Sequence, residues 1–151
     1  MRLWRISQRK YALDKLCAGA AQFGGRWNPI GIPALYCATS IALCSLEKFI
    51  HIRAAPYPPL MLVAVDIPDS SALYTPSIAE LPLGWNAMPT SAVAASFGGA
   101  WLATESSLGM IVPSAIIPEE SNVVINTWHP DYAHVELRVV RPFAFDGRMF
   151  K

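Results

Sequence analysis

The sequence predicts a mixed α+β domain that spans residues 1–151. Short apolar or alternating runs rich in β-branched residues recur along the chain between Pro, Gly and Asn clusters, which is typical of strands. Two longer apolar segments instead follow a Ser or Thr that can cap a helix. A length of 151 residues suits one ordinary domain, so the chain is expected to fold around one core.

The first third of the chain predicts strands flanking a loop, followed by a helix. The elements expected in order are a strand over Leu3–Ser7, a loop over Phe23–Gly31, a buried strand over Pro33–Ala38, and a helix from Ile41 to about His51 that Thr39 or Ser40 caps.

The rest of the chain predicts four more strands and a second helix. These are a strand over Leu60–Ile67, an irregular stretch over Pro76–Pro89, a helix capped by Thr90 or Ser91 that runs to about Thr104, and strands over Gly109–Val112, Asn122–Ile125 and Val135–Val140. Gly98 and Gly99 cost this second helix about 1 kcal/mol each relative to Ala. Close packing against another element is the expected reason for them.

Composition narrows the classes of function. Hydrophobic residues make up 53% of the chain and charged residues 15%, against a typical charged share of about 25%. The surface is therefore expected to carry apolar area for a partner. A net charge of +1 with scattered basic residues predicts no direct nucleic acid binding.

The same composition favours a cytoplasmic protein. No apolar run approaches the roughly 18 residues of a membrane span, and the N-terminus lacks the apolar core of a signal peptide, so no membrane association is expected. Cys17, Cys37 and Cys44 have no metal-ligand spacing and are expected to be reduced, packed thiols. His129 and His134 fit no zinc pattern, so no metal is predicted.

Glu47 is the first candidate for a functional residue. A helical wheel places it beside Cys44 and His51 on a helix that is apolar over most of its circumference, where a carboxylate is costly unless it is paired or used. An ordinary ion pair with Lys48, His51 or Arg53 at the helix surface explains it equally well. Spacing alone leaves both readings open.

The sequence Gly24-Gly25-Arg26-Trp27-Asn28 is the second candidate. Two glycines allow close backbone approach to a ligand, and a guanidinium offers a planar fork to phosphate oxygens. The segment matches neither a P-loop nor a GxGxxG turn. The ordinary alternative is a turn with a packed Trp27.

Ser114 and Tyr36 are weaker candidates when taken alone. Ser114 lacks the GxSxG frame of a nucleophile elbow, and a serine in a turn is usually structural. Tyr36, on a buried strand, fits the core as well as a stacking platform for a ligand.

Several motifs in a fixed order resemble the RES domain family of bacterial toxins, which is named after its Arg, Glu and Ser. The resemblance covers nearly the whole chain and rests on LWRIS, GGRWNPIGIPALYCATSIALCSLEKFIH, VPSAIIPEESNVVIN and PFAFDGRMF. It implies a fold like that of ADP-ribosyltransferases, with a split, mixed β-sheet and flanking helices. It also implies NAD as the substrate, cleaved between nicotinamide and ribose.

The resemblance further implies roles for individual residues. Arg26 is expected to grip the NAD phosphates, Tyr36 to pack on the nicotinamide ribose or ring, and Ser114 to orient Glu47 or the substrate. Glu47 is expected to contact the ribose and to stabilise the positive charge that develops as the bond breaks. The supporting polar or stacking residues of the NAD site are expected to be Arg5, Trp27, Asn28, Asn122 and Asn126.

A RES toxin is expected to have a partner. The resemblance implies an Xre-like antitoxin that covers the NAD cleft, so that any DNA contact is indirect. Three functions remain open: depletion of NAD by hydrolysis or phosphorolysis, transfer of ADP-ribose to a host protein, and a catalytically inactive module that only docks the antitoxin.

Overall fold

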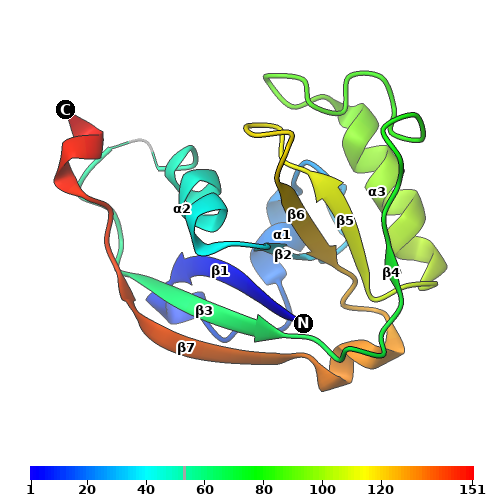
Figure 1. Cartoon of the computed structure of the whole chain (residues 1–151), viewed down its shortest axis with the longest axis horizontal. Coiled ribbons are helices and arrows are strands. Elements are labelled where there is room, and N and C mark those ends of the chain that lie inside the picture. Colours follow the sequence, from blue (N-terminus) through cyan, green and yellow to red (C-terminus); the bar gives the residue numbers. More distant parts are fainter. Residues whose placement is uncertain (53) are drawn as a thin grey trace.

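One mixed β-sheet of seven strands organises the molecule in a computed structural model, which describes residues 1–52 and 54–151 (Figure 1). The strand order is β4-β5-β6-β2-β1-β3-β7, and only β4 and β5 run parallel to each other. The strands are β1 (Arg2–Gln8), β2 (Leu35–Ala38), β3 (Leu60–Asp66), β4 (Leu73–Tyr74), β5 (Gly109–Pro113), β6 (Ser121–Ile125) and β7 (Glu136–Phe143).

The sheet divides between β1 and β2. β1 pairs with β3 along its whole length, and β2 pairs with β6 along its whole length. β1 and β2, in contrast, are joined only at Trp4 and Ala38. Beyond that pair the two halves of the sheet diverge, as Figure 1 shows, and this divergence corresponds to the split sheet that the family resemblance implied.

Three helices flank the sheet: α1 (Ala18–Phe23), α2 (Ile41–Phe49) and α3 (Ala92–Thr104). Short 3-10 turns follow at Arg9–Tyr11 (η1), Pro130–His134 (η2) and Gly147–Phe150 (η3). One face of the sheet packs in a core that includes Cys17 and Tyr132. The other face carries two cores, one under α3 and one under α2.

The position of α2 is fixed at its first turn. Ser40 is the N-cap, and its hydroxyl accepts a hydrogen bond from the Leu43 N–H at 3.1 Å. Just before it, the Thr39 amide and hydroxyl both donate to the Ser121 carbonyl, at 3.3 and 3.1 Å. The start of α2 is therefore tied to the start of β6.

The two glycines of α3 allow the helix to lie directly on the Gly24–Pro29 loop. A Cβ on Gly98 would overlap the carbonyl of Trp27, and one on Gly99 would lie 2.9 Å from the ring of Pro29. This contact confirms the expectation of close packing. Ser91 precedes the helix as predicted, but it makes no capping bond, because its hydroxyl donates to the Gly84 carbonyl at 3.1 Å.

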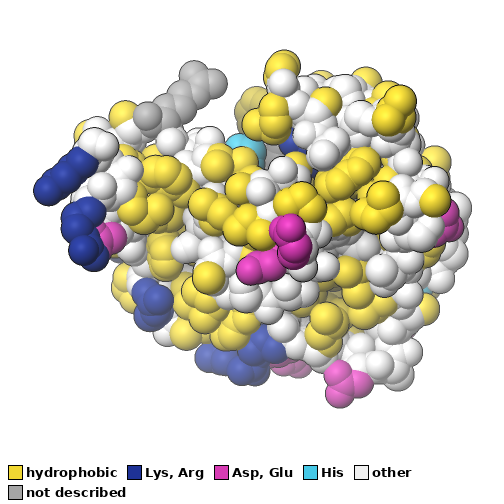
Figure 2. Space-filling view, turned by 45° about the horizontal axis from the view of Figure 1, so that its top comes forward, with side chains coloured by type: hydrophobic (Ala, Val, Ile, Leu, Met, Phe, Trp, Pro, Cys, Tyr) yellow, Lys and Arg dark blue, Asp and Glu magenta, His cyan; other side chains and the backbone are white. Residues whose placement is uncertain are grey.

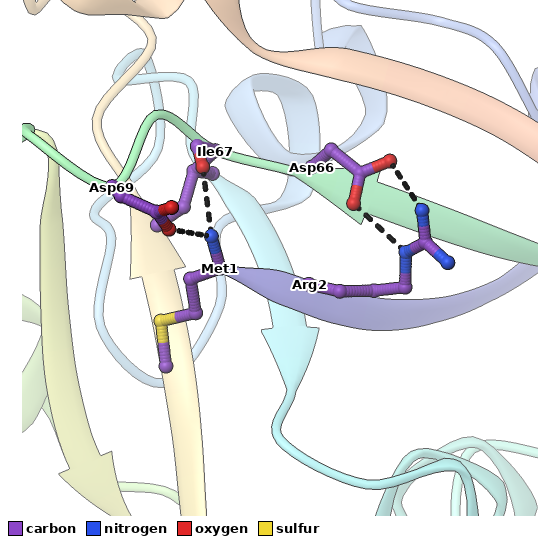
Figure 3. A network of polar contacts seen from close by, with 5 residues as sticks. All are labelled: Met1, Arg2, Asp66, Ile67 and Asp69. Carbon is purple, nitrogen blue, oxygen red and sulfur yellow. Dashed lines mark hydrogen bonds and ion pairs between the residues drawn. The ribbon is translucent and has the colours of Figure 1, made fainter.

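Polar contacts hold the beginning of β1 against the end of β3 (Figure 3). Arg2 donates to both oxygens of Asp66, at 2.8 and 3.1 Å, and the Met1 amino group reaches the Ile67 carbonyl and Asp69. The N–H of Ile67 in turn donates to the Met1 carbonyl at 3.0 Å. These contacts continue the β1–β3 ladder past its last paired residues.

Most of the predicted elements are confirmed, with shifts at their ends. The mixed α+β class and all six predicted strands are present, although β2 begins at Leu35 and not at Pro33. α2 ends at Phe49, two residues before the predicted end at His51. α1 and β4 were not predicted, and α1 extends to Phe23, the first residue of the predicted loop. Among the described residues, no helix is long and apolar enough to cross a membrane.

Candidate active site

A cavity of about 490 Å³ lies where β1 and β2 separate. Arg5 to Gln8 of β1 and Ala34 to Ala38 around β2 line it, as do residues of α1 and α2. Its size is within the range of small-molecule sites, about 300–1,000 Å³. The missing ladder between the two strands thus leaves room for a ligand inside the sheet.

One stripe of α2, continued by the turn after it, faces this cavity. Cys44, Glu47 and Lys48 of α2 and His51 of that turn line it, at the spacing of three and four residues that places side chains on one side of a helix. The helical wheel had placed Glu47 beside Cys44 and His51, and these three residues do share one face.

One oxygen of Glu47 is held by two side chains. Its Oε1 accepts a hydrogen bond from Ser114 Oγ at 2.8 Å and a second from Asn122 Nδ2 at 2.6 Å. Its other oxygen, Oε2, makes no hydrogen bond within the described residues. The suggested pairing with Lys48 or His51 is not found there, and Arg53 lies outside the described residues.

In the hydrogen bond between Ser114 and Glu47, the serine hydroxyl must be the donor. Its Oγ accepts hydrogen bonds from the Ile116 and Ile117 amides at 3.0 and 3.1 Å, which use its acceptor capacity. The side chain is fully buried, directly after β5. The hydroxyl proton is therefore committed to the carboxylate, and the turn that follows β5 fixes its direction.

Asn122 reaches Glu47 from β6. It pairs with Ala38 across the β2–β6 ladder, one residue after the Ser121 carbonyl that anchors Thr39. The same contacts that fix the start of α2 thus set the distance between Glu47 and Asn122. Asn122 also lines the cavity.

Tyr36 lines the cavity from β2, and its hydroxyl is engaged behind it. The hydroxyl donates to Asn28 Oδ1 at 2.6 Å and accepts from the Trp27 N–H at 3.0 Å. Burial raises the pKa of the Tyr36 phenol far above its ordinary value, so the ring stays neutral. The ring can therefore present an uncharged face to a ligand.

Asn28 and Trp27 lie in the interior and are not among the lining residues. The Asn28 amide donates to the carbonyls of Ala20 and Ile32, both at 2.8 Å, and Trp27 stacks on Trp85 with ring centroids 6.0 Å apart. Their exposed fractions are 1% and 3%. What they visibly do is hold Tyr36, so contact with NAD stays a prediction for both.

Arg26 is not among the residues that line the cavity. Its Nη1 donates to the carbonyls of Trp85 and Ala87 at 2.8 and 3.2 Å, and its Nη2 lies 3.3 Å from Met88 Sδ. Its charge is near enough to Tyr36 to act on the pKa of the phenol. The structure brings Arg26 beside Tyr36 but not beside Glu47.

Arg5 does face the site. It lines the cavity from β1, and its buried Nη1 has no hydrogen-bond partner among the described residues. A buried guanidinium nitrogen without an acceptor is costly, which indicates that an anion can complete this site.

Asn126 has a structural position. Its amide donates to the Leu102 carbonyl at 2.9 Å, and its side-chain oxygen accepts from the Trp128 N–H at 3.0 Å. It is fully buried and is not among the residues that line the cavity. It joins the end of β6 to α3.

Lys48 and the three cysteines line the cavity and were not predicted as site residues, unlike Arg5. Lys48 lies four residues after Cys44, a spacing that could have indicated its place on the cavity stripe. The three cysteines also line the cavity and are free and buried, in agreement with the predicted packed thiols. No group of three or more His, Cys, Asp or Glu side chains in the described part of the chain could hold a metal.

Comparisons with known proteins place this geometry in context. The sequence profile of the family described as the RES domain matches residues 2–146. The chain is 40% identical to "Prs ADP-ribosylating toxin" of Sphingobium sp. over 98% of this chain and 96% of that protein. It is 37% identical to "Toxin Res" of Yersinia enterocolitica over 99% of both.

A solved structure shares the fold. The chain superposes on a chain of the M. tuberculosis MbcT–MbcA toxin–antitoxin complex with a TM-score of 0.73 and 20% identity, over 99% of this chain and 86% of that one.

Proposed function

The chain belongs to the RES domain family, and from that premise we propose that it is the toxin of a toxin–antitoxin system, which cleaves the bond between nicotinamide and ribose in NAD. The observation that supports this most is the arrangement of Glu47, which has one oxygen held by two donors and the other left for a substrate.

The held carboxylate suits this chemistry. When the C1′–N bond breaks, nicotinamide leaves as a neutral base with the bonding electrons, and positive charge develops on the ribose. Glu47 stabilises that charge best if it is fixed in place before the reaction. Ser114 and Asn122 supply this fixation, because both donate to Oε1 and turn Oε2 away from themselves.

The cavity also suits the rest of the dinucleotide. Tyr36 offers a neutral aromatic ring in the same cavity as Glu47, on which nicotinamide or its ribose can pack. The unpartnered Nη1 of Arg5 offers a charged donor for a phosphate.

Arg26 is proposed to have a structural role in the first place. Both of its terminal nitrogens are engaged by residues 85–88, so it holds that segment beside Tyr36. Contact with the NAD phosphates, the role that the family resemblance implies, requires the guanidinium to exchange the Trp85 and Ala87 carbonyls for phosphate oxygens.

The test is release of nicotinamide. Purified protein is incubated with NAD, with and without inorganic phosphate, and free nicotinamide is followed over time. Glu47→Gln, which keeps the size of the side chain, is the matched control and is expected to release it about 10²–10³-fold more slowly. The proposal is contradicted if the wild-type protein releases no nicotinamide under any of three conditions: without phosphate, with phosphate, or with cell lysate as a source of acceptors.

The acceptor of ADP-ribose distinguishes the two forms of this activity. If water or phosphate is the acceptor, the ADP-ribose is released as a small molecule, whereas a protein acceptor keeps it covalently attached. The name of the Sphingobium relative favours transfer to a protein. NAD labelled in its adenylate part, mixed with lysate, is expected to label a protein band if transfer occurs and none if NAD is simply cleaved.

An antitoxin is the proposed partner, in line with the complex that shares this fold. Apolar side chains are exposed near the cavity: Leu16 (80%) shortly before α1, Phe23 (74%) at the end of α1, and Tyr11 (49%) on η1. Phe23 and Tyr11 also line the cavity. Figure 2 shows hydrophobic side chains in a broad band across one face, with Lys and Arg side chains at its left and lower edges and an acidic group near its middle. Leu16→Asp, at an exposed residue that is not among those lining the cavity, is expected to weaken inhibition by the cognate antitoxin while NAD cleavage continues.

A module that only docks the antitoxin is the competing reading. It predicts that Glu47→Gln inhibits growth as strongly as the parent chain when produced without antitoxin. The arrangement of Glu47, Ser114 and Asn122 favours the enzyme, because a docking surface has no need for a carboxylate fixed in a cavity.

A further inference from the structure

We propose that Lys48, together with Arg5, forms an anion subsite of the cavity that binds the phosphates of the dinucleotide. The identification of the anion rests on the proposed function, whereas the subsite itself rests on the placement of two cations. Lys48 is the residue after Glu47, so this assignment puts the group that binds phosphate next to the group that acts at the ribose.

Lys48 faces the cavity without a partner. It belongs to the stripe of α2 that lines the cavity, and its side chain is half-buried. Among the described residues the ammonium of Lys48 makes no hydrogen bond and no ion pair. A charged amino group in a partly desolvated cavity is stabilised by an anionic partner, so this unpartnered lysine indicates a place for an anion.

Arg5 brings a second positive charge to the same cavity. Burial lowers the pKa of Lys48, and the positive charge of Arg5 lowers it further, which shows that the two cations act on each other. Nη1 of Arg5 is itself buried and unpartnered. Two like charges held close together in a partly desolvated site repel each other unless an anion lies between them.

The carboxylates of the cavity do not neutralise this pair. Asp14 and Glu47 both line the cavity. An oxygen of Asp14 accepts from the Leu16 N–H at 2.9 Å, and Glu47 Oε1 is held by Ser114 and Asn122. Neither carboxylate forms an ion pair with Lys48 or Arg5 within the described residues. The pair therefore remains available to a ligand that carries more than one negative charge, as a pyrophosphate does.

The pair also explains how a dinucleotide can bind while Arg26 is engaged elsewhere. Arg26 donates to the Trp85 and Ala87 carbonyls and is not a lining residue. Lys48 is a flexible point charge and Arg5 a planar donor, a combination that suits phosphate oxygens of varied orientation.

The experiment compares three probes by calorimetric titration: inorganic pyrophosphate, ADP-ribose and nicotinamide. The variants are Lys48→Met, which keeps the length of the side chain, Lys48→Arg, which keeps the charge, and Lys151→Met as the same change at an exposed lysine. Loss of one charged hydrogen bond is worth about tenfold in affinity. Lys48→Met is therefore expected to weaken the binding of pyrophosphate and of ADP-ribose about tenfold and to leave the binding of nicotinamide unchanged.

The two controls make the result specific. Lys48→Arg is expected to retain pyrophosphate binding within about threefold, because the positive charge remains. Lys151→Met is expected to match the wild type for all three probes. Circular dichroism of each variant checks that the fold is intact.

The outcomes separate this inference from the proposed function. Equal affinity of Lys48→Met and wild type for pyrophosphate overturns the subsite even if NAD is cleaved. Equal weakening of nicotinamide and ADP-ribose also overturns it, because that pattern reports a general disturbance of the cavity. Pyrophosphate binding that depends on Lys48, in a protein that releases no nicotinamide, supports the subsite and contradicts the proposed function. Wild-type protein that binds neither pyrophosphate nor ADP-ribose overturns the subsite, and the release of nicotinamide from NAD still decides the proposed function.

Discussion

The hydroxyl of Ser114 donates a hydrogen bond of 2.8 Å to Glu47, across 67 residues of sequence. Because the Ile116 and Ile117 amides donate to the same hydroxyl oxygen, rotation of the hydroxyl would break this arrangement. Ser114 is therefore a positioning residue that acts through Glu47.

Ser114→Ala is expected to reduce both activity and stability. It removes one of two donors to Glu47 and leaves two amides without an acceptor in a fully buried place. A hydrogen bond to a charged group is worth about 1.5–3 kcal/mol, so nicotinamide release should fall roughly 10- to 100-fold. The free energy of unfolding should fall by about 1–3 kcal/mol.

Steady-state nicotinamide release and urea unfolding measure the two effects of Ser114→Ala. Ser91→Ala is the control, because it removes a serine that precedes α3 and does not line the cavity. If Ser114→Ala retained the full rate, Ser114 would have no part in positioning Glu47.

Asn122 can be tested through the pH profile. Its Nδ2 donates to Glu47 Oε1 at 2.6 Å, and Asn122→Asp replaces this donor with a carboxyl that can donate only when it is protonated. The activity of Asn122→Asp relative to wild type is therefore expected to be highest at acidic pH and to fall as pH rises. Asn122→Ala removes the donor at every pH and should lower kcat by a nearly constant factor.

The measurement for Asn122 is kcat for nicotinamide release between about pH 5 and pH 8. A ratio of Asn122→Asp to wild type that stays constant across this range would show that the amide does not act as a donor to Glu47. A change confined to KM would instead support the predicted contact of Asn122 with NAD.

Much of the fold could be predicted because its signals are local. Ser40 precedes an apolar periodic segment, and α2 begins directly after it. α1 could not be found in this way, because its N-cap is Cys17 in a left-handed conformation without a side-chain capping bond. β4 has two residues, too few for any period to be visible.

The site was predictable only in part, because its contacts are not local. Glu47 could be singled out from its helical face, but Ser114 and Asn122 lie 67 and 75 residues away from it. The strand register and the turn after β5 bring them together, and neither is visible in one sequence. Trp27 was interpreted either as a packed residue of a turn or as a contact to NAD. Its stacking on Trp85 agrees with the packed turn residue.

The thiols that line the cavity are expected to react slowly. Burial raises the pKa of Cys44 from its ordinary value of 9.0 to about 12, and it raises the pKa of Cys17 and Cys37 as well. A rise of three units lowers the thiolate fraction at pH 8 by about 10³-fold. Iodoacetamide should therefore modify the native protein far more slowly than the protein in guanidinium, and rapid alkylation of native Cys44 would contradict its burial.

Cys44 also gives stability a dependence on pH. Its pKa is higher in the folded state, so its contribution is fully present below the unfolded value near 9 and declines as pH rises from there towards 12. Urea unfolding is measured at about pH 7.5 and about pH 10. Between these two pH values the free energy of unfolding should fall less for Cys44→Ala than for the wild type. An equal loss in both proteins would remove Cys44 as a cause.

Gly98 is expected to be the most sensitive glycine of α3, because the backbone of the Gly24–Pro29 loop occupies the place where a Cβ would lie. Gly98→Ala must push that loop away from the helix, and overpacking of this kind costs about 1–3 kcal/mol. The loop carries Asn28, whose side chain orients the Tyr36 hydroxyl in the cavity wall. Gly98→Ala should therefore lower the melting temperature and raise KM for NAD together.

Gly147→Ala is the matched control, because nothing lies within 4 Å of a Cβ at Gly147 and its φ is not positive. Both variants add one methyl group to a glycine, so a difference between them reports the contact with Trp27. A shift of about 1 kcal/mol corresponds to roughly 2–4 °C for a chain of this length, which scanning calorimetry resolves. The opposite outcome is that Gly98→Ala melts at the same temperature as Gly147→Ala and keeps the wild-type KM for NAD. In that case the Gly24–Pro29 loop could move away from α3 at no cost, and its packing on α3 would not be what holds Tyr36 in place.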